Sequence, residues 1–318
     1  IYFVYTVLLL VSSDGENRIL RYLKQNRTKP WVKRNFDRII TDPPVTYEIP
    51  ECGDEELIHR PVVVGAGPAG LFCALSLARR GFCPILVERG ENVDDRSRTV
   101  KSFWEGERLQ PDSNVSFGEG GAGTFSDGKL TTLTKDTLGR NTFVIKTFAE
   151  HGAPREITSE AKPHIGTDIL KSVVKNIRKE IISLGGEVRF NTRLTDIKAA
   201  GGTLSAVVVT DVTNKTVSTI ETAVCILCIG HSARDTFEML YENRTDMSPK
   251  SFAAGFRVIH PQSAVNLWQY GIEGTNGTNL PPADYKVANE TAGGTFDGSV
   301  YTGQYGVMYH KTNYVTYV

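Results

Sequence analysis

A glycine-rich turn between two apolar runs constrains the fold of this chain more than any other feature. Val62-Val63-Val64 has the composition of a buried strand, and Gly65-Ala66-Gly67-Pro68-Ala69-Gly70 follows it directly. Residues 69–80 then have the apolar content of a helix, and Ile85-Leu86-Val87 predicts a second strand. This order predicts a βαβ unit with a parallel sheet.

The glycines of this turn match the separate requirements of a dinucleotide site. Gly65 permits a tight turn, Gly67 lets the backbone approach a pyrophosphate, and Gly70 lets the helix pack closely on the strand. Glu88 stands 23 positions after Gly65, at the end of the second strand, where it is expected to accept hydrogen bonds from a ribose. Because an acid disfavours a 2′-phosphate, the residues predict FAD or NAD rather than NADP. The alternative is a turn that only joins a strand to a helix.

A second glycine-dense segment spans residues 117–130. Gly118, Gly120, Gly121 and Gly123 predict a backbone with unusual torsions or one that a ligand approaches closely. Polar groups that could contact such a ligand stand in the same segment, at Thr124, Ser126, Asp127 and Lys129. A flexible surface loop is the alternative interpretation.

The rest of the chain divides into three expected parts. Residues 1–58 form a small N-terminal α/β lobe and linker, in which residues 1–11 are a buried strand, 14–25 a helix and 27–58 a connector. Residues 59–245 form the dinucleotide-binding domain, and residues 246–318 begin a second, incomplete domain. Within the central part we expect a helix capped by Thr167, a strand at 187–190, meander strands at 194–197, 204–210 and 216–222, and a last strand at 224–229.

Composition excludes several classes of function. Lysine plus arginine number 36 and aspartate plus glutamate also number 36, so no net positive charge attracts nucleic acid. The five cysteines lack the spacing of a zinc site or a disulfide framework, and Cys225 and Cys228 should point to opposite faces of a strand. The apolar run at residues 1–11 is too short to span a membrane. We therefore expect a soluble protein of a reducing compartment, such as the cytoplasm or an organelle stroma or matrix, with no bound metal.

Taken in order, several motifs resemble the predicted FAD-dependent dehydrogenases of the two-dinucleotide-binding-domain flavoprotein superfamily. The motifs run from about Arg60 to about Gly271 and are VVVGAGPAGLFCALSLARRG, VERG, NVSFGEGGAGTFSDGKL, KPHIGTDIL, IGHSARDTFEML and AAGFRVIHPQ. The resemblance implies a doubly wound α/β FAD-binding domain of glutathione-reductase type, interrupted by a β meander and followed by a cap domain.

This resemblance also implies which residues contact FAD. Arg96 would meet a phosphate, and Gly230 would approach the cofactor after the meander. From the residues themselves, Lys129 could stabilise an anionic reduced flavin, and His231, at the end of a strand, could transfer a proton. The full set of expected cofactor contacts is Gly65, Gly67, Pro68, Ala69, Gly70, Glu88, Arg89, Arg96, Gly120, Gly121, Ala122, Gly123, Thr124, Ser126, Lys129 and Gly230.

Near its end the chain departs from the family pattern. The expected C-M-C-P-G-G segment and a late glycine motif are missing, which suggests a truncated or divergent end. Three interpretations follow: an FAD-dependent oxidoreductase that transfers hydride between a small-molecule substrate and flavin, with NAD(P)H as a possible electron donor; a truncated flavoprotein that binds FAD without turnover; or an NAD-binding regulatory module. The residues name no substrate.

Overall fold

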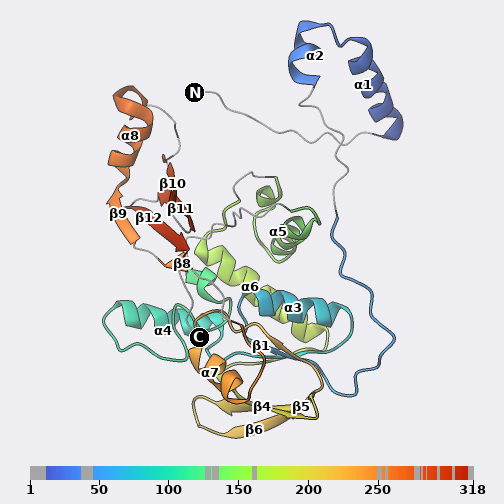
Figure 1. Cartoon of the computed structure of the whole chain (residues 1–318), viewed down its shortest axis with the longest axis vertical. Coiled ribbons are helices and arrows are strands. Elements are labelled where there is room, and N and C mark those ends of the chain that lie inside the picture. The colour runs from blue at the N-terminus through green and yellow to red at the C-terminus, as the bar shows by residue number, and fades with distance from the viewer. Residues whose placement is uncertain are drawn as a thin grey trace. The chain divides into compact units, whose positions relative to one another are not determined.

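The computed structural model describes residues 12–36, 46–125, 130, 136–159, 163–248, 253–254, 257–275, 280, 282–283, 285–291, 294–302 and 305–313 (Figure 1). The chain forms two compact units, Ile1–Ala233 and Arg234–Val318, which are described separately. The strand expected at residues 1–11 lies outside the described residues, as do Ser126, Asp127 and Lys129. The expected domain boundaries at residues 58 and 245 stay predictions.

A four-stranded parallel sheet is the centre of the first unit. Its order is β3-β2-β1-β7, in which β1 (Val62–Val64) pairs with both β2 (Ile85–Val87) and β7 (Cys225–Leu227). Strand β3 (Glu187–Arg189) extends the sheet beyond β2. The three residues of β1 and of β2 are all buried, which is typical of strands covered on both faces.

Two helices cover one face of this sheet. Helix α3 (Pro68–Arg79) connects β1 to β2, and α6 (Thr167–Ser183) precedes β3 (Figure 1). Val63 and Leu86 share a buried core with Leu75 of α3 and with Val173 and Ile177 of α6. Removing each such side chain from water contributes about 1.5–3 kcal/mol, so this core is the main reason that the two helices stay on the sheet.

An antiparallel meander links β3 to β7. Its strands are β4 (Thr192–Ala200), β5 (Thr203–Asp211) and β6 (Val217–Glu221), paired in chain order. Val207 and Val209, which share one face of β5, are buried, and so is Ala206 on the opposite face. The expected α/β class, a parallel sheet with an inserted meander, is confirmed.

Shorter elements complete the first unit. They are α1 (Ser13–Gln25), α2 (Pro30–Asn35), α4 (Val93–Trp104), η2 (Ala122–Phe125), α5 (Arg140–Glu150) and η3 (Arg155–Thr158). The connector expected at residues 27–58 contains one short helix, α2, in which Pro30 occupies the first turn, where a missing N–H costs no hydrogen bond. The expected cap is also displaced: Gly166, not Thr167, is the N-cap of α6.

The second unit has its own antiparallel sheet. Strands β8 (Ala253–Ala254), β9 (Arg257–Pro261), β10 (Tyr285–Thr291), β11 (Gly294–Thr302) and β12 (Tyr305–Asn313) form it in the order β10-β11-β12-β8, with β9 also pairing with β12. Helices α7 (Arg234–Glu242) and α8 (Gln262–Thr275) belong to the same unit. Gly271 has a φ of 70°, which kinks α8.

Candidate dinucleotide site

The first glycine turn lies at the carboxyl end of β1, between the ends of β2 and β7. Gly65 has a φ of +99°, and its N–H donates to the Val87 carbonyl at 2.7 Å. A Cβ added at Gly70 would lie 1.7 Å from the Gly65 carbonyl oxygen, so helix α3 reaches this position only with glycine there. Gly67 is the N-cap of α3, so the first N–H groups of the helix are presented at this end of the sheet.

Glu88, directly after β2, connects this turn to two other segments. Its carboxylate accepts hydrogen bonds from the N–H groups of Ala66 (2.6 Å), Gly90 (2.9 Å) and Gly118 (3.0 Å). The side chain is only 4% exposed. Glu88 therefore holds the glycine turn in place, and its contact with a ribose stays a prediction.

The second glycine segment lies directly on the first. Gly120 N–H donates to the Ala66 carbonyl at 2.8 Å, and a Cβ added at Gly121 would lie 3.2 Å from the Gly67 Cα. Gly118, Gly120 and Gly121 all have positive φ angles, which other residues rarely adopt. The backbone conformation therefore accounts for glycine at these three positions, and a flexible surface loop is not needed to explain them. Two segments that are about 50 residues apart in the chain thus share one site.

Arg96 of α4 is buried beneath this second segment. Its Nε donates to the Asn114 carbonyl at 2.9 Å, and its Nη1 donates to the carbonyls of Gly118 (3.2 Å) and Glu119 (2.6 Å). The side chain is 0% exposed, yet Nη2 has no hydrogen-bond partner within the described residues. Burial lowers the pKa of Arg96 to about 10 against the attraction of Glu88 and Glu119, so the side chain remains charged at neutral pH.

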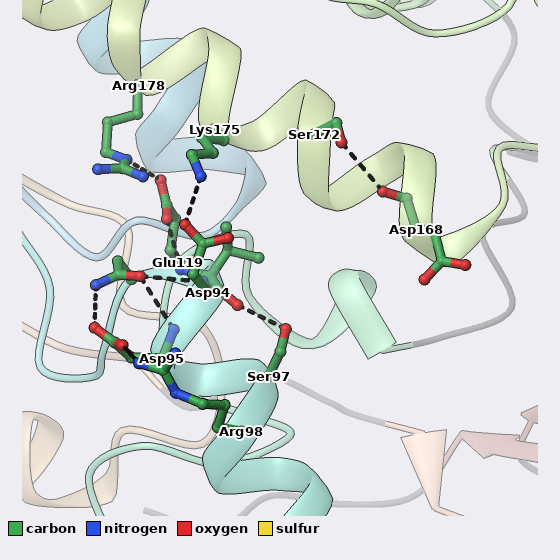
Figure 2. Close-up of polar contacts among 11 residues, drawn as sticks. Asp94, Asp95, Ser97, Arg98, Glu119, Asp168, Ser172, Lys175 and Arg178 are labelled. Carbon is green, nitrogen blue, oxygen red and sulfur yellow. Dashed lines mark hydrogen bonds and ion pairs between the residues drawn. The ribbon is translucent and has the colours of Figure 1, made fainter.

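Glu119 is a residue that sequence reasoning missed. Its carboxylate accepts from the Val93 N–H at 2.7 Å and from Arg178 Nε of α6 at 2.7 Å. Burial is the largest influence and raises its pKa, against these two favourable contacts. Figure 2 shows Arg178 and Lys175 reaching from α6, Lys175 towards Asp94 of α4, at 2.6 Å. The sequence did contain one signal for Glu119, which is that an acidic residue stands between two glycines, Gly118 and Gly120.

The other expected contacts lie around the same turn or just beyond it. Pro68 and Ala69 are exposed at the start of α3, and Ala122, Gly123 and Thr124 form η2. Thr124 is buried, whereas a Cβ at Gly123 would meet no atom within 4 Å. Arg89 stacks on the Phe117 ring with its Cζ 4.6 Å from the centroid. Gly230 and His231, after β7, are exposed.

Residues 63–110 match the family model described as NAD(P)-binding Rossmann-like domain. That range holds β1, α3, β2 and α4, and with them Glu88 and Arg96. The chain carries a Rossmann-like dinucleotide-binding domain.

One relative and two solved structures show how far similarity to known proteins extends. A protein of Clostridium beijerinckii, called "Uncharacterized protein", is 52% identical over 241 residues, or 76% of this chain and 44% of the relative. This chain thus spans less than half the length of that curated relative.

The solved structures are more distant. The glycerol-3-phosphate dehydrogenase of Bacillus halodurans, complexed with FAD, matches 81% of this chain and 48% of its own at 14% identity and a TM-score of 0.46. The flavin-dependent monooxygenase PieE, in complex with FAD and substrate, matches 81% of this chain and 43% of its own at 14% identity and a TM-score of 0.38. Similarity at this level assigns no cofactor or reaction.

Two classes of site are not found in the part of the chain that the structure describes. Among those residues no helix is both long and apolar enough to cross a membrane. The same residues contain no group of three or more histidine, cysteine, aspartate or glutamate side chains that could hold a metal ion.

Proposed function

We propose that this domain binds FAD and belongs to an FAD-dependent oxidoreductase. The observation that carries the proposal is the close contact between the two glycine segments at the carboxyl end of β1, where Gly120 N–H donates to the Ala66 carbonyl. Ligands of open α/β sheets bind at such an end, where the chain leaves the sheet in opposite directions on either side of one strand. Here β1 is that strand, with β2 on one side and β7 on the other.

The residues present fit a dinucleotide. The first N–H groups of α3 offer neutral donors to a pyrophosphate. Gly123, where a Cβ would meet no atom within 4 Å, leaves space for a ligand to approach. Arg96 offers the unpartnered Nη2 for a phosphate oxygen. Phe125 stacks on the face of that guanidinium, with its ring centroid 4.8 Å from Cζ. Because Nη2 is buried, a phosphate would reach it only if neighbouring atoms move aside.

FAD would supply hydride transfer, while this chain would bind the adenosine and pyrophosphate half. We further propose that His231 and Lys129 lie near the reacting groups, His231 because it follows the carboxyl end of β7, where ligands of such sheets bind. The substrate is a small molecule, and NADH or NADPH is the proposed electron donor. The match covers 44% of the relative, and turnover is proposed for the whole oxidoreductase rather than for this domain by itself.

The alternative function is binding of NAD by a module without redox chemistry, and it is favoured by the description of the matching family model. The absorbance spectrum of the purified protein separates the two. We expect a flavin band, or its appearance after reconstitution with FAD, and tight NAD binding without flavin uptake would support the alternative.

Anaerobic titration of the flavin-loaded protein with NADH and then NADPH tests the oxidoreductase proposal. Bleaching of the flavin band by either donor is the expected result. Binding of FAD without reduction by either donor would support a flavoprotein domain that binds FAD without turnover.

A further inference from the structure

Two cysteines from separate elements meet beneath the first glycine turn. Cys73 lies on α3 one turn after Gly70, and Cys228 follows β7. A Cβ added at Gly70 would lie 3.4 Å from the Cys228 Cβ, and positions three apart on a helix lie on the same side of it. Cys73 and Cys228 also pack against the same buried hydrophobic core, so the two side chains lie close to each other.

Both cysteines are held in place. Cys228 N–H donates to the Val64 carbonyl at 2.8 Å, and its own carbonyl oxygen would lie 2.5 Å from a Cβ at Gly65. Cys73 packs against the hydrophobic core between α3 and α6. Both side chains remain partly exposed, so a small oxidant can reach them.

We propose that Cys73 and Cys228 form a redox-active dithiol that hydrogen peroxide oxidises to a disulfide, which joins α3 to the end of β7. The Cys228 thiolate attacks one peroxide oxygen, the O–O bond breaks, and a proton completes the water that leaves, so that Cys228 becomes a sulfenic acid. The Cys73 thiol then attacks this sulfur and loses its proton, the S–O bond breaks, and a second water leaves. Two thiols are oxidised and one peroxide is reduced to two waters.

The local charge distribution favours Cys228 as the attacking group. The hydrogen bond from Cys73 lowers the pKa of Cys228 to about 7, against the opposing effect of burial. The same hydrogen bond, followed by burial, raises the pKa of Cys73. Cys225 is the competing partner for Cys228, but burial raises its pKa to about 11. Thiolates are the nucleophiles in such reactions, so Cys228 should react first.

Peptide mapping of the cofactor-free chain tests this pairing independently of flavin binding. The chain is treated with hydrogen peroxide, its remaining thiols are blocked with N-ethylmaleimide, and it is digested with trypsin plus the glutamate-specific protease. Residues 57–79 then carry Cys73 alone, while residues 222–234 carry Cys225 and Cys228. We expect these two peptides to be cross-linked, and dithiothreitol to separate them.

Matched variants identify the partners. The Cys225→Ser variant should keep the cross-link, and both Cys73→Ser and Cys228→Ser should lose it. A Cys225–Cys228 bridge, or alkylation of Cys73 and Cys228 in the peroxide-treated chain, would overturn the proposal.

The pH dependence of alkylation gives a second readout. The rate at Cys228 should have a midpoint near pH 7, and Cys73→Ala, which removes the hydrogen-bond donor, should move it towards that of an ordinary thiol. At pH 7 the higher pKa would lower the thiolate fraction of Cys228 about 15-fold. Because the nucleophilicity of a thiolate rises with its pKa, by about 5-fold here, the alkylation rate should fall roughly 3-fold. An unchanged midpoint in Cys73→Ala would contradict the assignment of Cys228 as the group that reacts first.

Discussion

Glu88 holds together three segments that are separated in the chain. Its two oxygens accept from the N–H groups of Ala66, Gly90 and Gly118, whereas a carboxylate offers about four acceptor sites. One site therefore remains for a ribose hydroxyl without loss of the existing hydrogen bonds. The same side chain can serve the fold and the proposed cofactor.

Replacing Glu88 with glutamine tests the structural part of this role. The amide would turn an NH₂ group towards at least one backbone N–H, and a buried hydrogen bond to a charged group contributes about 1.5–3 kcal/mol. We expect Glu88→Gln to lower the free energy of unfolding by about that amount, measured by urea denaturation without cofactor. The matched control is Glu105→Gln, whose carboxylate is exposed and lies 3.7 Å from Lys101. Equal stability of the two variants would show that the Glu88 carboxylate does not hold the turn.

Single residues differ in how far the sequence predicts them. The positive φ angles of Gly65, Gly120 and Gly121 follow from glycine itself, because other residues rarely adopt them. The burial of Arg96 could not be predicted, since it depends on carbonyls of residues 114–119 that fold back over α4. The proximity of Cys73 and Cys228 was missed for the same reason, because it depends on contacts between residues far apart in the chain.

At the scale of elements, Gly70 decides how closely α3 approaches β1. In Gly70→Ala the new Cβ would meet the Gly65 carbonyl, so the helix or the turn must shift, at a cost of about 1–3 kcal/mol. Gly123→Ala is the matched control, because a Cβ there meets no atom within 4 Å. Urea denaturation should show Gly70→Ala destabilised and Gly123→Ala as stable as the parent. A stable Gly70→Ala would contradict the close approach of helix and turn.

Glu180 links α6 to two other helices. Its carboxylate accepts from Arg79 Nε of α3 at 2.7 Å and lies 2.7 Å from His151 Nε2 at the end of α5. The hydrogen bond from Arg79 is the main cause of its lowered pKa. This stabilisation is therefore present above the unfolded-state pKa of about 4.3 and is lost as pH falls through the lower folded-state pKa.

Acid titration of stability checks this link. At pH 7 we expect Glu180→Gln to be less stable than the parent by about 1–2 kcal/mol, since the ion pair is partly buried. The difference should shrink as the pH falls below about 4, where the unfolded state binds the proton, and should disappear below the lower folded-state pKa, where both states bind it. Melting temperatures of parent and variant across this range provide the measurement, with Glu105→Gln as the exposed control. A difference that stays constant with pH would exclude the carboxylate as its source.

Elements with a strong local signal were predicted well. Hydrophobic periodicity, together with the glycines that end each element, predicted the positions of β1, α3, β2, α6, β3 and the meander. Helix α2 was missed because Lys29-Pro30 was taken as a break rather than as a helix start. The strands β10–β12 gave no clear signal, since their pairing joins long, polar and glycine-containing runs whose order is set by contacts far apart in the chain.

At the scale of the whole molecule, the proposed site lies in the first of two compact units. Both glycine segments, Glu88 and Arg96 belong to residues 1–233, so the adenosine and pyrophosphate contacts need no residue of the second unit. The balance of 36 basic and 36 acidic residues gives no long-range attraction for an anion. Binding of a negatively charged dinucleotide must therefore depend on local donors, which hydrogen exchange can locate.

Hydrogen–deuterium exchange with and without FAD would show where binding occurs. FAD at about 100 times its dissociation constant stabilises the binding form by about 2.7 kcal/mol, so amides that exchange through global opening should slow roughly 100-fold. We expect the strongest protection at residues 65–70 and 118–123, where the two glycine segments meet. NAD in place of FAD is the matched comparison, because an NAD-binding module would be protected by NAD alone. Protection confined to residues 234–318, in protein whose absorbance shows bound flavin, would place the cofactor elsewhere and refute the proposed site.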